Sequence, residues 1–232
     1  MDIHVLHDAR AVAGIAGVDA PACESIALSM EDPSQVLFSF VGGNPLDPGW
    51  LIDLDLPATR IACWSGTLAD GDDLFAAHPH NWMSPGGDAL RGLLEQLLPQ
   101  FEQAGRTICL IPHARHLVSD VQGTINLARA HAGSALEIAL APASLLVPSM
   151  LETLEDHLER SFSTLSETAS FLLIEDLMLD EEGDRLVPAA FGEGVLDLAL
   201  LRNAIARHWP IDKPIVLRPG NLPEQLDWLK GE

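Results

Sequence analysis

The pattern of hydrophobic and polar positions is clearest from residue 84 onward. Ser84 and Pro85 predict a helix start, a cap followed by a proline in the first turn, and Gly105 predicts its end. Between them, apolar residues recur at spacings of three and four, which places them on one face of a helix that packs against the core. These residues are Leu90, Leu93, Leu94, Leu97, Leu98 and Phe101.

Short apolar runs and helical segments then alternate to the end of the chain. Thr107–Ile111 is a predicted strand, Asp120 is predicted to cap a helix that Gly133 closes, and Leu136–Leu140 is the next predicted strand. The later predicted elements are a helix behind a capping box of Ser149 and Glu152, a strand from Ser170, a helix through Leu198, Leu201 and Ile205, a strand at Pro214–Leu217 and a closing helix from Asn221.

Residues 1–86 contain apolar runs of strand length joined by irregular segments rich in proline and glycine. The predicted strands are Ile3–His7, Glu24–Met30, Gln35–Val41 and Arg60–Ser65. The stretch Ala9–Ala20, rich in alanine and glycine, is predicted to form a short helix.

This alternation of strands and helices predicts a parallel sheet with right-handed crossovers. The strands are continuous apolar runs, as expected where both faces of a sheet are covered. About eight strand starts favour an α/β fold of the (β/α)8 TIM-like barrel type, irregular in the N-terminal third, over an open doubly wound sheet. Neither GxGxxG nor a P-loop motif occurs, which argues against a nucleotide-binding open sheet. We expect residues 1–232 to form a single domain.

Charge and composition exclude some classes of binding partner. Thirty-four acidic residues against 13 basic ones give a net charge of −21. Such a surface repels phosphate backbones and anionic lipids, so we expect no nucleic-acid and no membrane partner. No apolar run approaches the ~18 residues of a spanning helix, and the N-terminus lacks the basic start of a signal peptide, so we expect a cytoplasmic protein. Cys23, Cys63 and Cys109 form no CxxC pair and are interpreted as small core residues.

Several strings in the second half carry a family resemblance. They are Leu110–Val118, Leu140–Leu146, Phe171–Asp176, Gly192–Gly194 with Asp197, and Pro214–Leu217. In their order and spacing over residues 84–230 they resemble the xylose-isomerase-like TIM barrels, the superfamily of sugar (phosphate) isomerases and epimerases and of the type 2 apurinic endonucleases. The resemblance implies a site where the strands hand over to the following loops.

The resemblance also implies a divalent metal held by carboxylates and histidine at the strand ends. At the positions where the family carries Glu, Asp, His, His and Glu, this chain has Ile111, Ala141, Ser144, Leu173 and Arg218. An aliphatic side chain cannot ligate a metal ion, and an arginine repels one. We therefore expect no metal at this position and assign no cofactor.

The candidate ligand-binding residues follow from the same loops. They are His113, His116, Asp176, Glu193, Arg218 and Trp64. The two histidines lie in a strand-to-helix loop, where an imidazole can bind a ligand or relay protons; the alternative is ordinary loop histidines that bond the backbone. Trp64, together with Trp82, can form an apolar floor for a sugar ring, and the alternative is plain core packing.

Two further groups have alternatives of their own. Arg218 can clamp a carboxylate or phosphate with its planar fork of donors, or it can form an ion pair with Glu193 or Asp176. Glu175 and Asp176 can act as an acid/base pair, or as a cap or part of a solvated loop. No residue is assigned a catalytic role.

The sequence thus suggests a divergent barrel that lacks the family's metal ligands. We expect a small-molecule (sugar or sugar-phosphate-like) binding or interaction protein, or a metal-independent enzyme; whether it is an enzyme, and its oligomeric state, stay open. The alternative is a metal-dependent sugar (phosphate) isomerase or epimerase with non-standard ligands, such as the N-terminal histidines His7, His78 and His80. An apurinic-site endonuclease is opposed by the missing ligands and by the charge.

Overall fold

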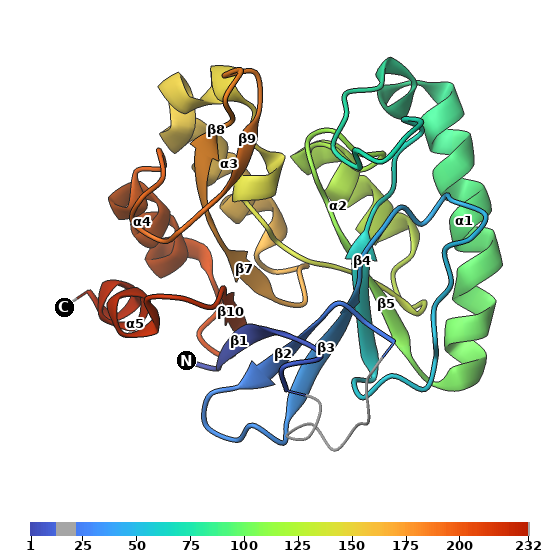
Figure 1. Ribbon diagram of the computed structural model, residues 1–232, viewed down its shortest axis with the longest axis horizontal. Coiled ribbons are helices and arrows are strands. Elements are labelled where there is room, and N and C mark those ends of the chain that lie inside the picture. The colour runs from blue at the N-terminus through green and yellow to red at the C-terminus, as the bar shows by residue number, and fades with distance from the viewer. Residues whose placement is uncertain (13–21, 232) are drawn as a thin grey trace.

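Eight strands form one curled sheet at the centre of the molecule (Figure 1); the computed structural model describes residues 1–12 and 22–231. Their order across the sheet is β6-β5-β4-β3-β2-β1-β10-β7. Each predicted strand is confirmed, with its start within two residues of the predicted one. The strands are β1 (Ile3–Asp8), β2 (Ser25–Ser29), β3 (Val36–Val41), β4 (Arg60–Trp64), β5 (Thr107–Ile111), β6 (Leu136–Ile138), β7 (Leu172–Ile174) and β10 (Ile215–Leu217).

The sheet curls so far that its two edge strands meet. Just beyond β6, Leu140 forms a parallel bridge with Leu172 of β7. The Leu140 amide donates to the Phe171 carbonyl at 3.0 Å, and the Leu173 amide donates to the Leu140 carbonyl at 2.9 Å. These bonds satisfy backbone groups that an open edge would leave unpaired.

The side chains inside the curl are mostly small or aromatic. One buried cluster takes members from nearly every strand, including Ala27, Ala62, Cys109, Ala139 and Val216. Small side chains on the concave face let the strands approach across a narrow interior. Phe38 and Phe171 stack in this interior with their ring centroids 4.5 Å apart.

One strand departs from the expected parallel arrangement. β2 is antiparallel to both β1 and β3, whereas the other neighbouring strands pair in parallel. The prediction of an all-parallel sheet is therefore wrong at β2. Residues 30–35, which join β2 to β3, are too few for a parallel crossover, which needs about a dozen residues or more.

The α/β class is confirmed, but a helix does not follow every strand. Among the described residues before Pro79 there is no helix, so the regular (β/α)8 pattern is not found in the N-terminal third. Residues 9–12 form a turn, and most of the predicted helix Ala9–Ala20 lies outside the described residues.

Helices cover the outer face of the curled sheet (Figure 1). They are α1 (Ser84–Ala104), α2 (Val121–Ala130), α3 (Leu154–Leu165), α4 (Leu198–His208) and α5 (Leu222–Lys230), with 3-10 turns η1 (Pro79–Trp82), η2 (Ala143–Leu145) and η3 (Pro148–Thr153). The apolar face of α1 packs against β4 and β5, as its periodicity predicts. The later helices share a second core with β6, β7 and β10. No helix in the described ranges has the length and hydropathy to cross a membrane.

The helix caps are confirmed in part. Asp120 caps α2 as predicted, accepting from the Gly123 amide at 2.8 Å. The cap residue of α1 is Met83 rather than Ser84, because the helix starts directly against the preceding 3-10 turn. The predicted capping box of Ser149 and Glu152 is wrong, since these residues belong to a 3-10 turn that runs into α3.

A hairpin that the sequence pattern had not predicted stands beside the sheet. Its strands β8 (Asp176–Leu179) and β9 (Leu186–Ala189) pair antiparallel, with the acidic turn 180–185 between them. It rises at one side of the sheet's open end, opposite the connection from β4 to α1 (Figure 1).

Candidate functional site

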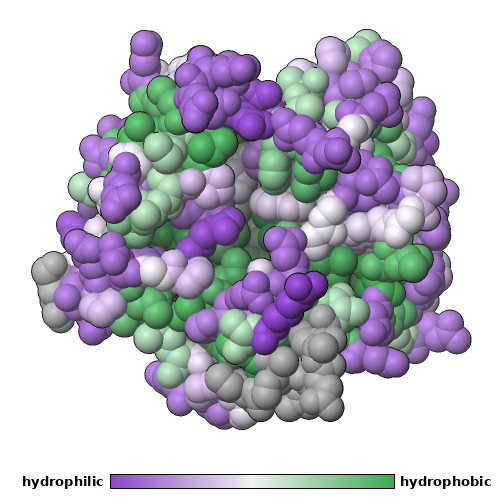
Figure 2. Space-filling view, viewed as in Figure 1, coloured by the Kyte–Doolittle hydropathy of each residue, from purple (hydrophilic) through white to green (hydrophobic). Residues whose placement is uncertain are grey.

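A cavity of about 400 Å³ opens at the edge of the sheet where most strands end and their connecting loops begin. Its floor comes from the ends of β3, β4, β5, β7 and β10 and from the start of the antiparallel β2. Its walls include residues 73–75, which follow β4, and residues 186–188 of β9. In Figure 2 the molecule is hollowed near the middle of this view, with apolar side chains (green) in the hollow and polar ones (purple) along its edges.

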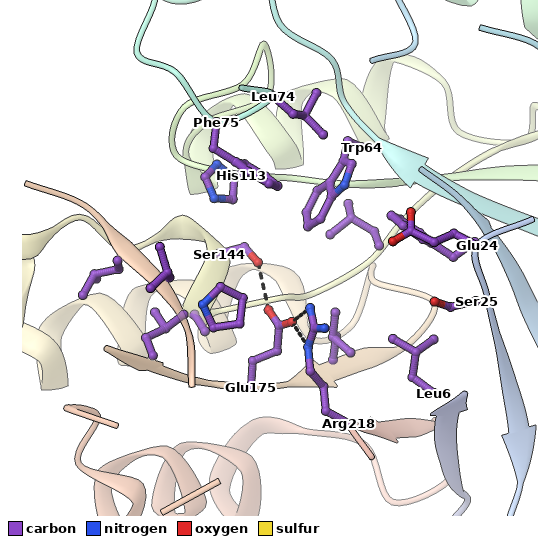
Figure 3. Close-up of a pocket in the computed structure, with 18 of the residues that line it drawn as sticks. Leu6, Glu24, Ser25, Trp64, Leu74, Phe75, His113, Ser144, Glu175 and Arg218 are labelled. Atoms are coloured by element: carbon purple, nitrogen blue, oxygen red, sulfur yellow. Dashed lines mark hydrogen bonds and ion pairs between the residues drawn. The ribbon is translucent and has the colours of Figure 1, made fainter. Parts of the chain in front are cut away.

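Arg218 and Glu175 form an ion pair at the centre of this pocket (Figure 3). The pairing of β10 with β7 sets Leu217 beside Ile174, so the next residue of each strand leaves the sheet side by side. The Arg218 Nε and Nη2 both donate to Glu175 Oε1. The Glu175 side chain is only 3% exposed, whereas that of Arg218 is 38% exposed. Of the two, the arginine is therefore the more accessible from the pocket.

Two neighbours hold this ion pair in place. Ser144 donates its hydroxyl to the second carboxylate oxygen of Glu175 at 3.3 Å. Gln225, buried at the start of α5, donates its amide to the carbonyls of Arg218 and Gly220, the former at 3.0 Å. Ser144 thereby holds the carboxylate, and Gln225 holds the backbone of the loop that carries Arg218.

The predicted environments of Arg218 and Glu175 differ from those in the structure. The predicted ion-pair partners of Arg218, Glu193 and Asp176, are wrong, because the arginine pairs with Glu175. The interpretation of Glu175 as a cap or solvated-loop residue is also wrong, because it is buried in the pocket floor. The sequence placed Glu175 one residue past an apolar strand, but it could not show that β10 lies beside that strand in the sheet.

Asp176 has a structural position rather than a place in the pocket. It is 2% exposed and accepts hydrogen bonds from the amides of Leu177, Gly192 and Gly194. A Cβ at position 194 would lie 2.1 Å from its Oδ1, so the glycine is required there. Asp176 therefore ties the loop before α4 to the hairpin, and Glu193 within that loop is exposed.

His113 lines the pocket on the side opposite Arg218 (Figure 3). The backbone amide of Arg115 donates to its Nδ1 at 3.1 Å, which leaves the ring proton on Nε2. Burial, with the nearby His116 and Arg115, lowers the pKa of His113 to about 3. At neutral pH its imidazole is therefore an uncharged hydrogen-bond donor.

His116 lies behind His113 and does not line this pocket. It is fully buried, stacks on Phe75 at 5.3 Å with an interplanar angle of 8°, and bonds the Leu74 carbonyl through Nε2 at 3.1 Å. Burial lowers the pKa of His116 to about 4, although the bond to Leu74 opposes the shift. It supports the wall that Leu74 and Phe75 make.

Trp64 forms the apolar wall between the histidine and the sheet. Its ring lies at right angles to Phe40 (centroids 5.7 Å apart) and to Phe75 (5.3 Å). Trp82 is 53% exposed and does not line the pocket, so the expected floor of two tryptophans is wrong for Trp82.

Glu24 and Ser25 were not predicted as site residues, yet both line the pocket (Figure 3). They reach it because β2 is antiparallel, which brings its N-terminal end to the edge where the parallel strands end. The short connection between β2 and β3 was the available signal for this reversal.

The positions expected to lack metal ligands can also be located. Ile111, Ser144, Leu173 and Arg218 line the pocket, and Ala141 is buried inside the curl. Across residues 1–12 and 22–231, no three histidine, cysteine or acidic side chains converge as a metal site would require. His78 and His80 lie near each other, with ring centroids 5.2 Å apart, and neither lines this pocket.

The sequence matches no protein-family model and no curated protein. The structure is similar to that of the probable 3-DHS dehydratase AsbF, involved in petrobactin synthesis, from Bacillus anthracis. That similarity has a TM-score of 0.51 at 14% identity and covers 83% of this chain and 73% of the other. It shows a shared fold and, at this identity, nothing further.

Two more solved structures are similar at lower scores. Endonuclease IV from Thermus thermophilus has a TM-score of 0.47 at 13% identity, over 75% of this chain and 62% of that one. A xylose isomerase domain protein from Planctomyces limnophilus has a TM-score of 0.46 at 12% identity, over 74% and 55%. At these scores the two similarities carry no further argument, and the similarity to the dehydratase agrees with the sequence resemblance in fold alone.

Proposed function

We propose that this chain is a single-domain, irregular member of the (β/α)8 barrel class that binds a small, sugar-like molecule in the pocket. The observation that carries the proposal is the convergence of polar groups in a mostly apolar cavity. Arg218, Glu175 and Ser144 lie on one side and His113 on the other, with Trp64 beside the histidine (Figure 3). A few fixed polar groups in an apolar pocket are the usual composition of a small-molecule site.

The polar groups match the hydroxyl groups of a sugar-like ligand. The free edge of Arg218 and the Nε2 of His113 donate hydrogen bonds, whereas Glu175 accepts them. Ser25 can do both, and Ser144, whose hydroxyl proton goes to Glu175, can accept. The face of an aromatic ring such as Trp64 packs against the apolar face of a sugar ring.

The proposal includes binding without a divalent metal. A guanidinium stands in the pocket centre, and its carboxylate partner is already engaged with it. A divalent ion at this place would compete with the guanidinium for Glu175 and would otherwise meet the aliphatic Ile111 and Leu173. Like charges a few ångströms apart repel by about 4 kcal/mol per unit charge at an effective dielectric of about 20.

Binding is favoured over catalysis by the state of the titratable groups. A general base works best with a pKa near the operating pH. The pKa of His113 lies near 3, and its Nδ1 already accepts a hydrogen bond. Glu175 is committed to Arg218, so neither residue is poised to remove a proton from a ligand.

The direct test is binding of small sugars and polyols by ligand-observed NMR. Leu186→Trp would fill the pocket from β9, and Met178→Trp, on the exposed part of the same hairpin, is the matched control. We expect binding to the wild type and to Met178→Trp, and loss of binding in Leu186→Trp. Binding that survives Leu186→Trp would place the ligand elsewhere and overturn the proposal.

Metal content separates this proposal from the isomerase alternative. After dialysis, elemental analysis should find no stoichiometric divalent ion, and manganese, zinc or magnesium should not raise the melting temperature. Replacing a residue that only hydrogen-bonds a metal ligand often costs ~10–100-fold in metal affinity, so the loss of several ligands should abolish binding. One equivalent of metal, released by His113→Ala, would favour a metal-dependent isomerase or epimerase.

A further inference from the structure

The charges that line the pocket leave one carboxylate unmatched. Arg218 pairs with Glu175, and Arg185, the last residue of the hairpin turn, pairs with Asp73 at 2.8 Å. Glu24 is the third acidic residue of the lining, and it forms no ion pair with any residue that the structure describes. The lining therefore carries a net negative charge.

The backbone and a glycine fix the position of Glu24. Its amide donates to the Phe40 carbonyl at 2.9 Å, and its carbonyl accepts from the Ala9 amide at 3.0 Å. A Cβ at position 42 would lie 1.9 Å from Glu24 Oε2, so Gly42 leaves the space that the carboxylate occupies. In Figure 3 Glu24 lies on the Trp64 side of the pocket, apart from the Arg218 ion pair.

Aromatic rings line the same pocket. Phe40 lies near the Glu24 carboxylate beside Gly42, Phe40 and Trp64 meet at 84°, and Trp64 and Phe75 meet at 89°, so the three rings pack edge to face along one wall. Aromatic faces attract organic cations, and the effect grows when the cation is shielded from water. The low pKa of His113 means that this histidine adds no opposing positive charge at neutral pH.

The pocket mouth has the same sign of charge. The hairpin turn places Asp180, Glu181, Glu182 and Asp184 beside the rim, where Arg185 and Arg115 are the basic groups lining the adjacent hollow. The whole chain carries a net charge of −21. A cleft rimmed by one sign of charge concentrates ligands of the opposite sign and repels those of its own.

We propose that the ligand carries a protonated amine, which Glu24 binds beside Phe40 and Trp64, and that the pocket rejects phosphorylated and carboxylated molecules. This inference rests on the proposed function and specifies its ligand class: an amine-bearing ring compound rather than a sugar phosphate. Arg218 then bonds neutral oxygens of the ligand, because its own charge is matched by Glu175.

The test uses three probes with one ring and different charge: cyclohexylamine, cyclohexanol and cyclohexanecarboxylate. Their dissociation constants are measured by NMR titration at neutral pH and low salt. We expect the wild type to bind the amine at least ~10-fold more tightly than the alcohol, as about 1.4 kcal/mol of added attraction would give, with no detectable binding of the carboxylate. Glu24→Gln should lower the affinity for the amine at least ~10-fold and so remove this preference.

Glu31→Gln is the matched control, because it removes the same charge from an exposed position outside the pocket. Equal effects of Glu24→Gln and Glu31→Gln, or carboxylate binding as tight as amine binding, would overturn the inference. If all three probes bind equally and Leu186→Trp abolishes their binding, the charge selectivity fails while the pocket's function stands. If Leu186→Trp leaves binding intact, the pocket is not the site and both fail.

Discussion

Replacing Arg218 and replacing Glu175 should lower the free energy of unfolding by different amounts. Arg218→Met leaves the Glu175 carboxylate without its partner in the pocket floor, where its side chain is 3% exposed. Glu175→Gln leaves the guanidinium of Arg218, 38% exposed, which water in the open pocket can still solvate. The structure thus predicts that Arg218→Met lowers the free energy of unfolding more than Glu175→Gln does.

The magnitudes follow from burial. Removing one partner of a buried pair commonly costs about 3–5 kcal/mol. Because the pocket is open and Ser144 still bonds Glu175, we expect Arg218→Met to lower the free energy of unfolding by about 2–3 kcal/mol. Glu175→Gln should cost about 1 kcal/mol or less, as for exposed pairs. The double substitution to methionine at both positions should lie within about 1 kcal/mol of the wild type, since no charge is left buried.

Urea denaturation followed by circular dichroism measures these differences, with equal m-values as the check that the same transition is compared. Equal losses for the two single variants would refute the reasoning. So would a double variant that is destabilised as much as Arg218→Met.

Three further predictions concern the core, the histidines and nucleic acid. Leu97→Ala should cost ~2–5 kcal/mol of unfolding free energy, whereas exposed Gln96→Ala should cost little; similar denaturation midpoints would contradict the packing of α1. Burial depresses the pKa values of His113 and His116 to about 3 and 4 from 6.5, so the unfolded state binds more protons and stability should fall as the pH drops below about 6.5. Replacing both histidines by glutamine should flatten that slope in pH-dependent urea denaturation, and an unchanged slope would contradict their burial as neutral groups. At physiological salt we expect no retention on duplex DNA in a mobility-shift assay, and micromolar salt-sensitive binding would contradict the charge argument.

The strands could be predicted from the sequence because each is a short apolar run bounded by turn residues. The direction of β2 could not be read from that pattern, since a buried antiparallel strand is apolar on both faces like a parallel one. The six-residue connection 30–35 held the missing information, because only an antiparallel return fits so short a link. The hairpin β8–β9 left a similar trace, with two apolar runs flanking the acidic, glycine-containing turn 180–185.

The candidate site was predictable only at a strand end or just past one. Trp64 ends β4, His113 lies two residues past β5 and Arg218 directly follows β10, and all three line the pocket. Glu24 and Phe75 enter it through a reversed strand and a long connection, and their approach depends on tertiary packing that no local pattern encodes. The pairing of Arg218 with Glu175 likewise follows from β10 lying beside β7, 43 residues apart in sequence.

The pocket between Trp64 and Arg218 should hold a small molecule without a metal ion. A crystal structure of the wild-type protein grown with a binding amine or polyol probe tests this claim most directly. We expect electron density for the probe between these two side chains, with Arg218 still paired to Glu175 and no metal peak in anomalous maps. Density for the probe at another place, or a metal ion in this pocket, would contradict it.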